Sequence, residues 1–201
     1  MNRLYNLTIP IIGITGGIAS GKSSFSKLIA DLGELVICAD NIVKEIYSKS
    51  ETKKYIKEIA PVAIDQSGEI NFKKLRELFF NNNQIKINIE QFIHPKIEPY
   101  FKEKILKNHQ RVFYDVPLLF EKKMESNFDH IVLVKVNEEI QLQRLINRDH
   151  ITEDLAKKII KNQLHFTEKE KMSNFIVENN LGLPELKQEA LNILKKITTL
   201  N

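Results

Sequence analysis

The chain has 201 residues, of which 42% are hydrophobic and 28% charged, a balance that favours a globular protein and argues against disorder. The formal net charge of +4 suits a phosphate-rich ligand but is too small to indicate nucleic-acid binding. The only cysteine, Cys38, excludes an internal disulfide and fits a reducing compartment, so we expect a cytoplasmic protein. The apolar run at 9–14 is too short to span a membrane, and nothing indicates an obligate protein partner.

Short apolar runs alternate with helical patterns along the chain. The apolar runs predict strands at 9–15, 35–37, 112–116, 131–136 and 175–177. Apolar residues at helical spacing predict a first helix ending near Gly33, followed by helices at about 41–49, 51–60, 72–81, 84–110, 138–148 and 184–197. The helix at 84–110 should be interrupted near His94-Pro95, and Thr152 should cap a further helix.

This alternation of strands and helices predicts an α/β fold with a mostly parallel sheet flanked by helices.

The strongest motif lies between the first strand and the first helix. Residues 16–23 fit G-x-x-x-x-G-K-[ST] at every fixed position. Glycines let successive N–H groups wrap a phosphate, and the helix that follows adds its positive dipole end. A chance glycine-rich turn is disfavoured by the strand-loop-helix context. We therefore expect ATP to contact Gly16, Gly17, Ile18, Ala19, Ser20, Gly21, Lys22, Ser23 and Ser24, with the Ser23 hydroxyl on Mg²⁺.

A phosphate loop alone leaves three classes open: a small-molecule kinase, a GTPase and a DNA-directed ATPase. The chain is short for the last class. No N-K-x-D guanine-specificity motif follows a later strand, which argues against the second.

Several other polar residues have two interpretations. Asp115 ends an apolar strand, where an acid can support Mg²⁺ or cap a turn. Arg144 and Arg148 share a helix face, which can bind phosphate or pair with nearby acids in solvent. His94 can contact an acceptor or stabilise a helix junction. Five lysines are interpreted as the solvated side of helices: Lys157, Lys158, Lys161, Lys169 and Lys171.

Further segments accompany the phosphate loop. They are V-I-C-A-D ending at Asp40, I-H-P at 93–95, D-V-P-L-L-F-E at 115–121, a glutamine and arginine series from Gln141 to Arg148, and the single residues Gln163 and Asn179. With them, the chain resembles the dephospho-CoA kinase family from about residue 10 to residue 182. The D-V-P-L-L-F-E run and the I-H-P triplet are specific, because P-loop kinases in general lack them.

The resemblance implies a single P-loop kinase domain over 1–201, with a P-loop NTPase fold. The core would comprise about 8–50, 110–148 and 174–201, the helical CoA-binding region about 51–109, and a mobile lid about 149–173. It implies that ATP phosphorylates the ribose 3′-hydroxyl of dephospho-CoA.

The resemblance also implies roles for individual residues. Lys22, Arg144 and Arg148 would act on the transferring phosphoryl group. Asp40 would be the general base, although an aspartate at the start of a helix is also a favoured N-cap. The substrate contacts would be Asp40, His94, Leu118 and Glu121, and the metal ligands Ser23 and Asp115. The chain departs from the family pattern at Cys38, at Phe72 and at Ser173-Asn174.

Two alternative functions remain open at this point. One is a nucleoside or nucleoside-monophosphate kinase, which would have a similar core. The other is a non-enzymatic switch that changes its affinity for a partner on nucleotide hydrolysis.

Overall fold

The structure is a computed structural model that describes residues 3–105 and 109–199. It divides into two compact units. The core unit comprises residues 1–38 and 107–201, and the helical unit comprises residues 39–106.

The core unit is built on a five-stranded sheet. Its strands are β1 (Ile11–Gly16), β2 (Val36–Cys38), β3 (Val112–Asp115), β4 (His130–Lys135) and β5 (Phe175–Glu178). They run parallel in the order β2-β3-β1-β4-β5. Every residue of β1 and β3 is buried, as expected for strands covered on both faces. The predicted α/β fold with a mostly parallel sheet is confirmed.

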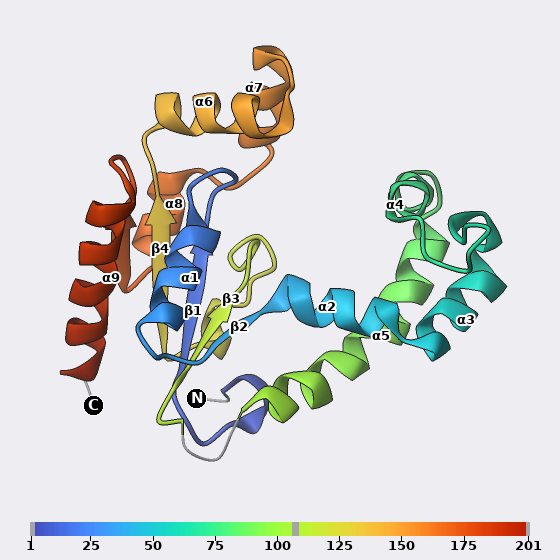
Figure 1. Cartoon of the computed structure of the whole chain (residues 1–201), viewed down its shortest axis with the longest axis horizontal. Helices are drawn as coiled ribbons and strands as arrows, with labels where there is room; N and C mark the ends of the chain where they lie inside the picture. Colours follow the sequence, from blue (N-terminus) through green and yellow to red (C-terminus); the bar gives the residue numbers. More distant parts are fainter. Residues whose placement is uncertain (1–2, 106–108, 200–201) are drawn as a thin grey trace. The chain divides into compact units, whose positions relative to one another are not determined.

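Five helices accompany this sheet: α1 (Lys22–Asp31), α6 (Glu138–Asp149), α7 (Glu153–Lys161), α8 (Phe166–Lys171) and α9 (Leu183–Thr198). The side chain of Thr152 caps α7 by accepting the N–H of Leu155 at 3.4 Å, as predicted. In Figure 1, β4 leads into α6, and α1 and α9 lie along the sheet. The hydrophobic core joins these helices to the strands through Ile12, Ile14, Phe25, Ile29, Phe113, Val132, Val134, Leu186 and Ile193.

The helical unit contains α2 (Ala39–Ser48), α3 (Ser50–Ile59), α4 (Phe72–Asn81) and α5 (Asn83–Lys104). Its buried apolar side chains include Ile42, Ile46, Ile56, Leu75, Ile89, Ile93 and Phe101, so the unit has a small core of its own. In the part of the chain that the structure describes, no helix has the length and apolar character needed to cross a membrane.

An interruption near His94-Pro95 could be a helix boundary or a kink. The boundary is wrong, because α5 continues through both Pro95 and Pro99, and the kink stays a prediction. A proline inside a helix removes one backbone hydrogen bond and costs about 3 kcal/mol. Ile93 and Phe101 are buried on either side of Pro95, and this tertiary packing holds both halves of the helix in place. The predicted end at 110 is also wrong, since His109 and Gln110 are not helical, while 106–108 lie outside the described residues.

Candidate active site

The phosphate loop connects the buried end of β1 to the first residue of α1. Gly21 has a φ of +87°, and a Cβ there would lie only 2.0 Å from Nδ2 of Asn179. A Cβ on Gly16 would lie 2.5 Å from the backbone carbonyl oxygen of Val134. Both positions therefore exclude a side chain, which explains the glycines of the motif. The loop ends at the N-terminus of α1, where unpaired N–H groups and the helix dipole favour an anion.

Lys22 and Asp115 form an ion pair beside the loop. Asp115 ends β3 in register with Ile14 of β1, and only 3% of its surface is exposed. Its second carboxylate oxygen accepts a hydrogen bond from Oγ of Ser26 at 2.7 Å. The predicted phosphate-binding lysine and the predicted strand-end acid are therefore in direct contact.

The residues present fit a magnesium ion of the kind that kinases use. Ser23 is exposed in the first turn of α1, next to the lysine that contacts Asp115. Mg²⁺ in such sites takes one or two protein ligands and completes its shell with phosphate oxygens and water. A dense carboxylate cluster is not required, and the described residues contain no group of three or more His, Cys, Asp or Glu that could hold a metal ion.

The two predicted arginines of α6 have different surroundings. Arg144 donates to the carbonyls of Asn179 at 3.0 Å and Leu181 at 3.4 Å. Asn179 in turn donates from Nδ2 to the loop carbonyl of Ser20 at 2.8 Å, so Arg144 is connected to the loop. Arg148 is exposed and forms two hydrogen bonds with the neighbouring Asp149, which raises the pKa of the arginine.

Sequence reasoning missed the side chains that hold the loop backbone. The N–H of Ile18 donates to Oε1 of Gln163 at 2.8 Å, and its carbonyl accepts from Nε2 of Gln141 at 2.8 Å. Phe166 covers Gly17. A recess of about 500 Å³ opens beside these residues and is also lined by α7. Gln141 and Gln163 both belong to the segments that carry the family resemblance, and this was the sequence feature that could have indicated their role.

Glu121 lies in the turn after β3 and contacts the segment that follows α7. Its Oε1 is 2.8 Å from Nζ of Lys169 and accepts the N–H of Leu164 at 3.2 Å. Lys169 is fully buried, so its interpretation as a solvated lysine is wrong. Leu118, in the same turn, is 37% exposed. The predicted substrate contacts of Leu118 and Glu121 stay predictions.

Asp40 and His94 belong to the helical unit, where both are exposed. Asp40 is the second residue of α2 and follows Cys38 by two positions. Cys38 pairs in register with Asp115. Two peptide units span at most about 8 Å, so the chain keeps the backbone of Asp40 near the carboxyl end of β2. His94 lies within α5, next to Pro95.

A glycine-rich phosphate loop between the first strand and the first helix of a parallel sheet, with an acid at the end of the neighbouring strand, defines a P-loop NTPase. The chain belongs to the dephospho-CoA kinase family, whose model matches residues 10–185. A dephospho-CoA kinase from Fusobacterium nucleatum is 42% identical over 182 residues, which cover 90% of this chain and 94% of the relative.

Two solved structures have a similar fold. A Thermus thermophilus protein superposes with a TM-score of 0.81 at 26% identity, over 94% of this chain and 97% of that one. A dephospho-CoA kinase from Campylobacter jejuni superposes with a TM-score of 0.68 at 28% identity, again over 94% and 97%. The resemblance stated from the sequence is thereby confirmed.

Proposed function

We propose that this chain transfers the γ-phosphate of ATP to the ribose 3′-hydroxyl of dephospho-CoA, giving CoA and ADP. The observation that carries the proposal is the phosphate loop with Lys22 against Asp115, in a chain that matches the dephospho-CoA kinase family over residues 10–185. Neither a nucleoside-monophosphate kinase nor a non-enzymatic switch is favoured by this match.

The loop binds the phosphates of ATP through its N–H groups, and Lys22 neutralises the β- and γ-phosphates. The Lys22–Asp115 pair holds the ammonium group beside the loop before nucleotide arrives. Ser23 and Asp115 would hold Mg²⁺, which when bound neutralises charge that develops on the phosphates. Arg144, which is connected to the loop through Asn179, supplies a permanent positive charge at the same edge.

Asp40 is the proposed general base. A ribose hydroxyl is a poor nucleophile until its proton has an acceptor, and a positioned carboxylate accepts it as the O–P bond forms. Two observations support the assignment: Asp40 follows β2 at the carboxyl edge of the sheet, and its carboxylate is exposed to an incoming substrate. Ligands of open α/β sheets bind at this edge.

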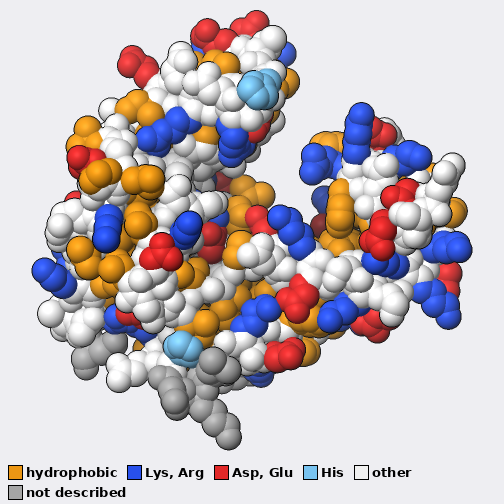
Figure 2. All heavy atoms as spheres, viewed as in Figure 1, with side chains coloured by type: hydrophobic (Ala, Val, Ile, Leu, Met, Phe, Trp, Pro, Cys, Tyr) orange, Lys and Arg blue, Asp and Glu red, His pale blue; other side chains and the backbone are white. Residues whose placement is uncertain are grey.

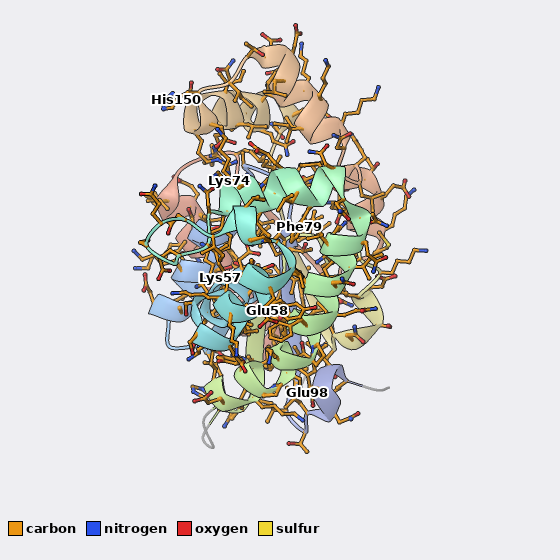
Figure 3. The ribbon with its side chains drawn as sticks, turned by 90° about the vertical axis from the view of Figure 1, so that its right-hand side faces the viewer. Lys57, Glu58, Lys74, Phe79, Glu98 and His150 are labelled. Atoms are coloured by element: carbon orange, nitrogen blue, oxygen red, sulfur yellow. The ribbon has the colours of Figure 1, made fainter. Side chains whose placement is uncertain are left out.

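The helical unit is the proposed binding region for the acceptor, together with His94, Leu118 and Glu121. Lysine and arginine side chains gather on its surface around α3 and α4 (Figure 2). Lys57 and Lys74 are exposed on these helices (Figure 3). Their charges suit the diphosphate of dephospho-CoA.

The product identifies the reaction. The purified protein is incubated with ATP, Mg²⁺ and dephospho-CoA, and the product is analysed by mass spectrometry and phosphorus NMR. We expect a product one phosphate heavier than dephospho-CoA, with the new monoester on the ribose 3′-oxygen. A phosphate at another position, or inorganic phosphate as the only new product, would contradict the proposal.

A further inference from the structure

Residues 163–169, which we call the strap, run from the end of the α7 segment into α8 and lie against the phosphate loop. Gln163 begins the strap and binds the N–H of Ile18. Phe166 lies over Gly17, so closely that a Cβ on this glycine would collide with its ring. The strap therefore contacts the loop at two successive residues.

The strap is fixed at its other end by a charge pair between buried Lys169 and half-buried Glu121. Lys169 has no exposed surface, and its ammonium group is in contact with the carboxylate of Glu121, although the pair is not aligned as a hydrogen bond. The same carboxylate oxygen accepts the N–H of Leu164. Removing one partner of a buried pair leaves an uncompensated charge, which strongly disfavours alternative arrangements. Glu121 thus ties both ends of the strap to the turn after β3.

The N–H of Ile18 cannot donate to phosphate while it donates to Gln163, and the carbonyl of Ile18 accepts from Gln141. Gln141, which is 2% exposed, holds the carbonyl from α6, and Gln163 holds the N–H from the strap. Because Ile18 is held on both sides, the N–H groups of the loop residues that follow it point in fixed directions. Donors that are already oriented stabilise developing phosphate charge without reorganising at the moment of reaction.

We infer that Gln163 is a positioning residue for the phosphoryl transfer, and that the Glu121–Lys169 pair holds the strap from which Gln163 acts. The inference rests on the proposed function for its catalytic consequence. The primary effect of Gln163, the ordering of the phosphate loop, does not depend on which substrate accepts the phosphoryl group. Glu121 acts in this arrangement through Lys169 and Leu164.

The first experiment replaces the acceptor oxygen of Gln163. Gln163→Met keeps the length of the side chain but cannot accept from Ile18, whereas Gln163→Glu retains an acceptor oxygen. Hydrogen exchange of residues 16–23 is measured without nucleotide, and binding of a non-hydrolysable ATP analogue by calorimetry. Loss of one hydrogen bond should speed loop exchange and weaken analogue binding by about tenfold in Gln163→Met. Exchange in Gln163→Glu should remain at the wild-type rate.

Gln188→Leu is the matched control, because Gln188 is an exposed glutamine of α9 whose side-chain amide donates to Asn192. It should match the wild-type protein in both measurements. Unchanged loop exchange in Gln163→Met would overturn the inference. Equally fast exchange in Gln163→Met and Gln163→Glu would also overturn it, because the acceptor oxygen would then not be the cause. Neither readout needs dephospho-CoA, so a wrong acceptor assignment would leave these results interpretable.

The second experiment separates positioning from substrate contact at Glu121. Glu121→Gln and Lys169→Met should each weaken analogue binding, and the double variant, which has no unpaired buried charge, should recover at least part of the lost thermal stability. If Glu121→Gln raises only the KM for dephospho-CoA and leaves analogue binding unchanged, Glu121 contacts substrate and its positioning role is refuted.

Discussion

At the scale of single residues, two glycines with similar backbone angles differ in their surroundings. Gly21 and Gly33 have φ values of +87° and +95°. A Cβ on Gly21 would have neighbours within 4 Å, the nearest being Nδ2 of Asn179, whereas a Cβ on Gly33 would have none among the described residues. Gly33→Ala should cost about 1–2 kcal/mol of unfolding free energy, from backbone strain alone. Gly21→Ala should cost more and should also weaken ATP binding. Urea denaturation and calorimetry measure both effects, and equal costs would contradict the steric argument.

Lys22 is expected to contribute to both catalysis and stability. Lys22→Met should lower turnover by about 10²-fold or more, because a charge on the transferring phosphate loses its partner. It should also destabilise the protein by about 1–3 kcal/mol, since Asp115 is buried beside it. Adding Asp115→Asn should recover stability without recovering turnover. Near-normal turnover in Lys22→Met would contradict the assignment of the phosphate loop.

Asp40→Asn tests the general base. Asp40 lies inside the first turn of α2, where a carboxylate contributes only through the helix dipole, by about 0.3–1 kcal/mol. Its loss should therefore hardly change the melting temperature. Turnover should fall by about 10²-fold or more if the carboxylate accepts the substrate proton, with ATP affinity unchanged. If turnover survives the substitution, Asp40 is not the general base and only interacts with the dipole of α2.

At the scale of elements, the segment proposed as a lid divides into two parts. Ala156 is the buried residue of α7, whereas the strap is tied to the loop and to Glu121. Hydrogen exchange in 149–162 should slow when an ATP analogue binds, because closure shields the γ-phosphate from water. The strap should be protected already without nucleotide. Strong and equal protection of 149–162 in both states would count against a lid.

The local patterns of the sequence predicted most elements. The apolar runs of β1, β3 and β4 and the glycine spacing of the loop depend on neighbouring residues, so they can be recognised from short segments. Continuation of α5 through Pro95 could not be predicted, since it depends on packing in the helical unit. The burial of Lys169 against Glu121 joins residues 48 positions apart, and no helical pattern indicates such a contact.

In the candidate site, too, local sequence patterns identified some residues, whereas other contacts depend on the fold. The phosphate-loop motif predicted Lys22, and the end of an apolar strand predicted Asp115. The contact between these two residues depends on the register of β1 with β3. The distinct surroundings of Arg144 and Arg148 could not be read from their common helix face. They depend on the turn after β5, which supplies the carbonyls that Arg144 binds.

At the scale of the whole molecule, each unit contains residues to which the proposed function gives a role. The phosphate loop lies in the core unit, and Asp40 and His94 lie in the helical unit. The extents of the CoA-binding region and the lid within this framework stay predictions.

The proposed function depends most directly on the identity of the acceptor. The most direct test compares initial rates of ADP release with dephospho-CoA, adenosine and the nucleoside monophosphates, at equal concentrations of acceptor, ATP and Mg²⁺. A site built to bind one acceptor should favour dephospho-CoA by about 10²-fold or more. A nucleoside monophosphate or adenosine that supports an equal or faster rate would contradict the account.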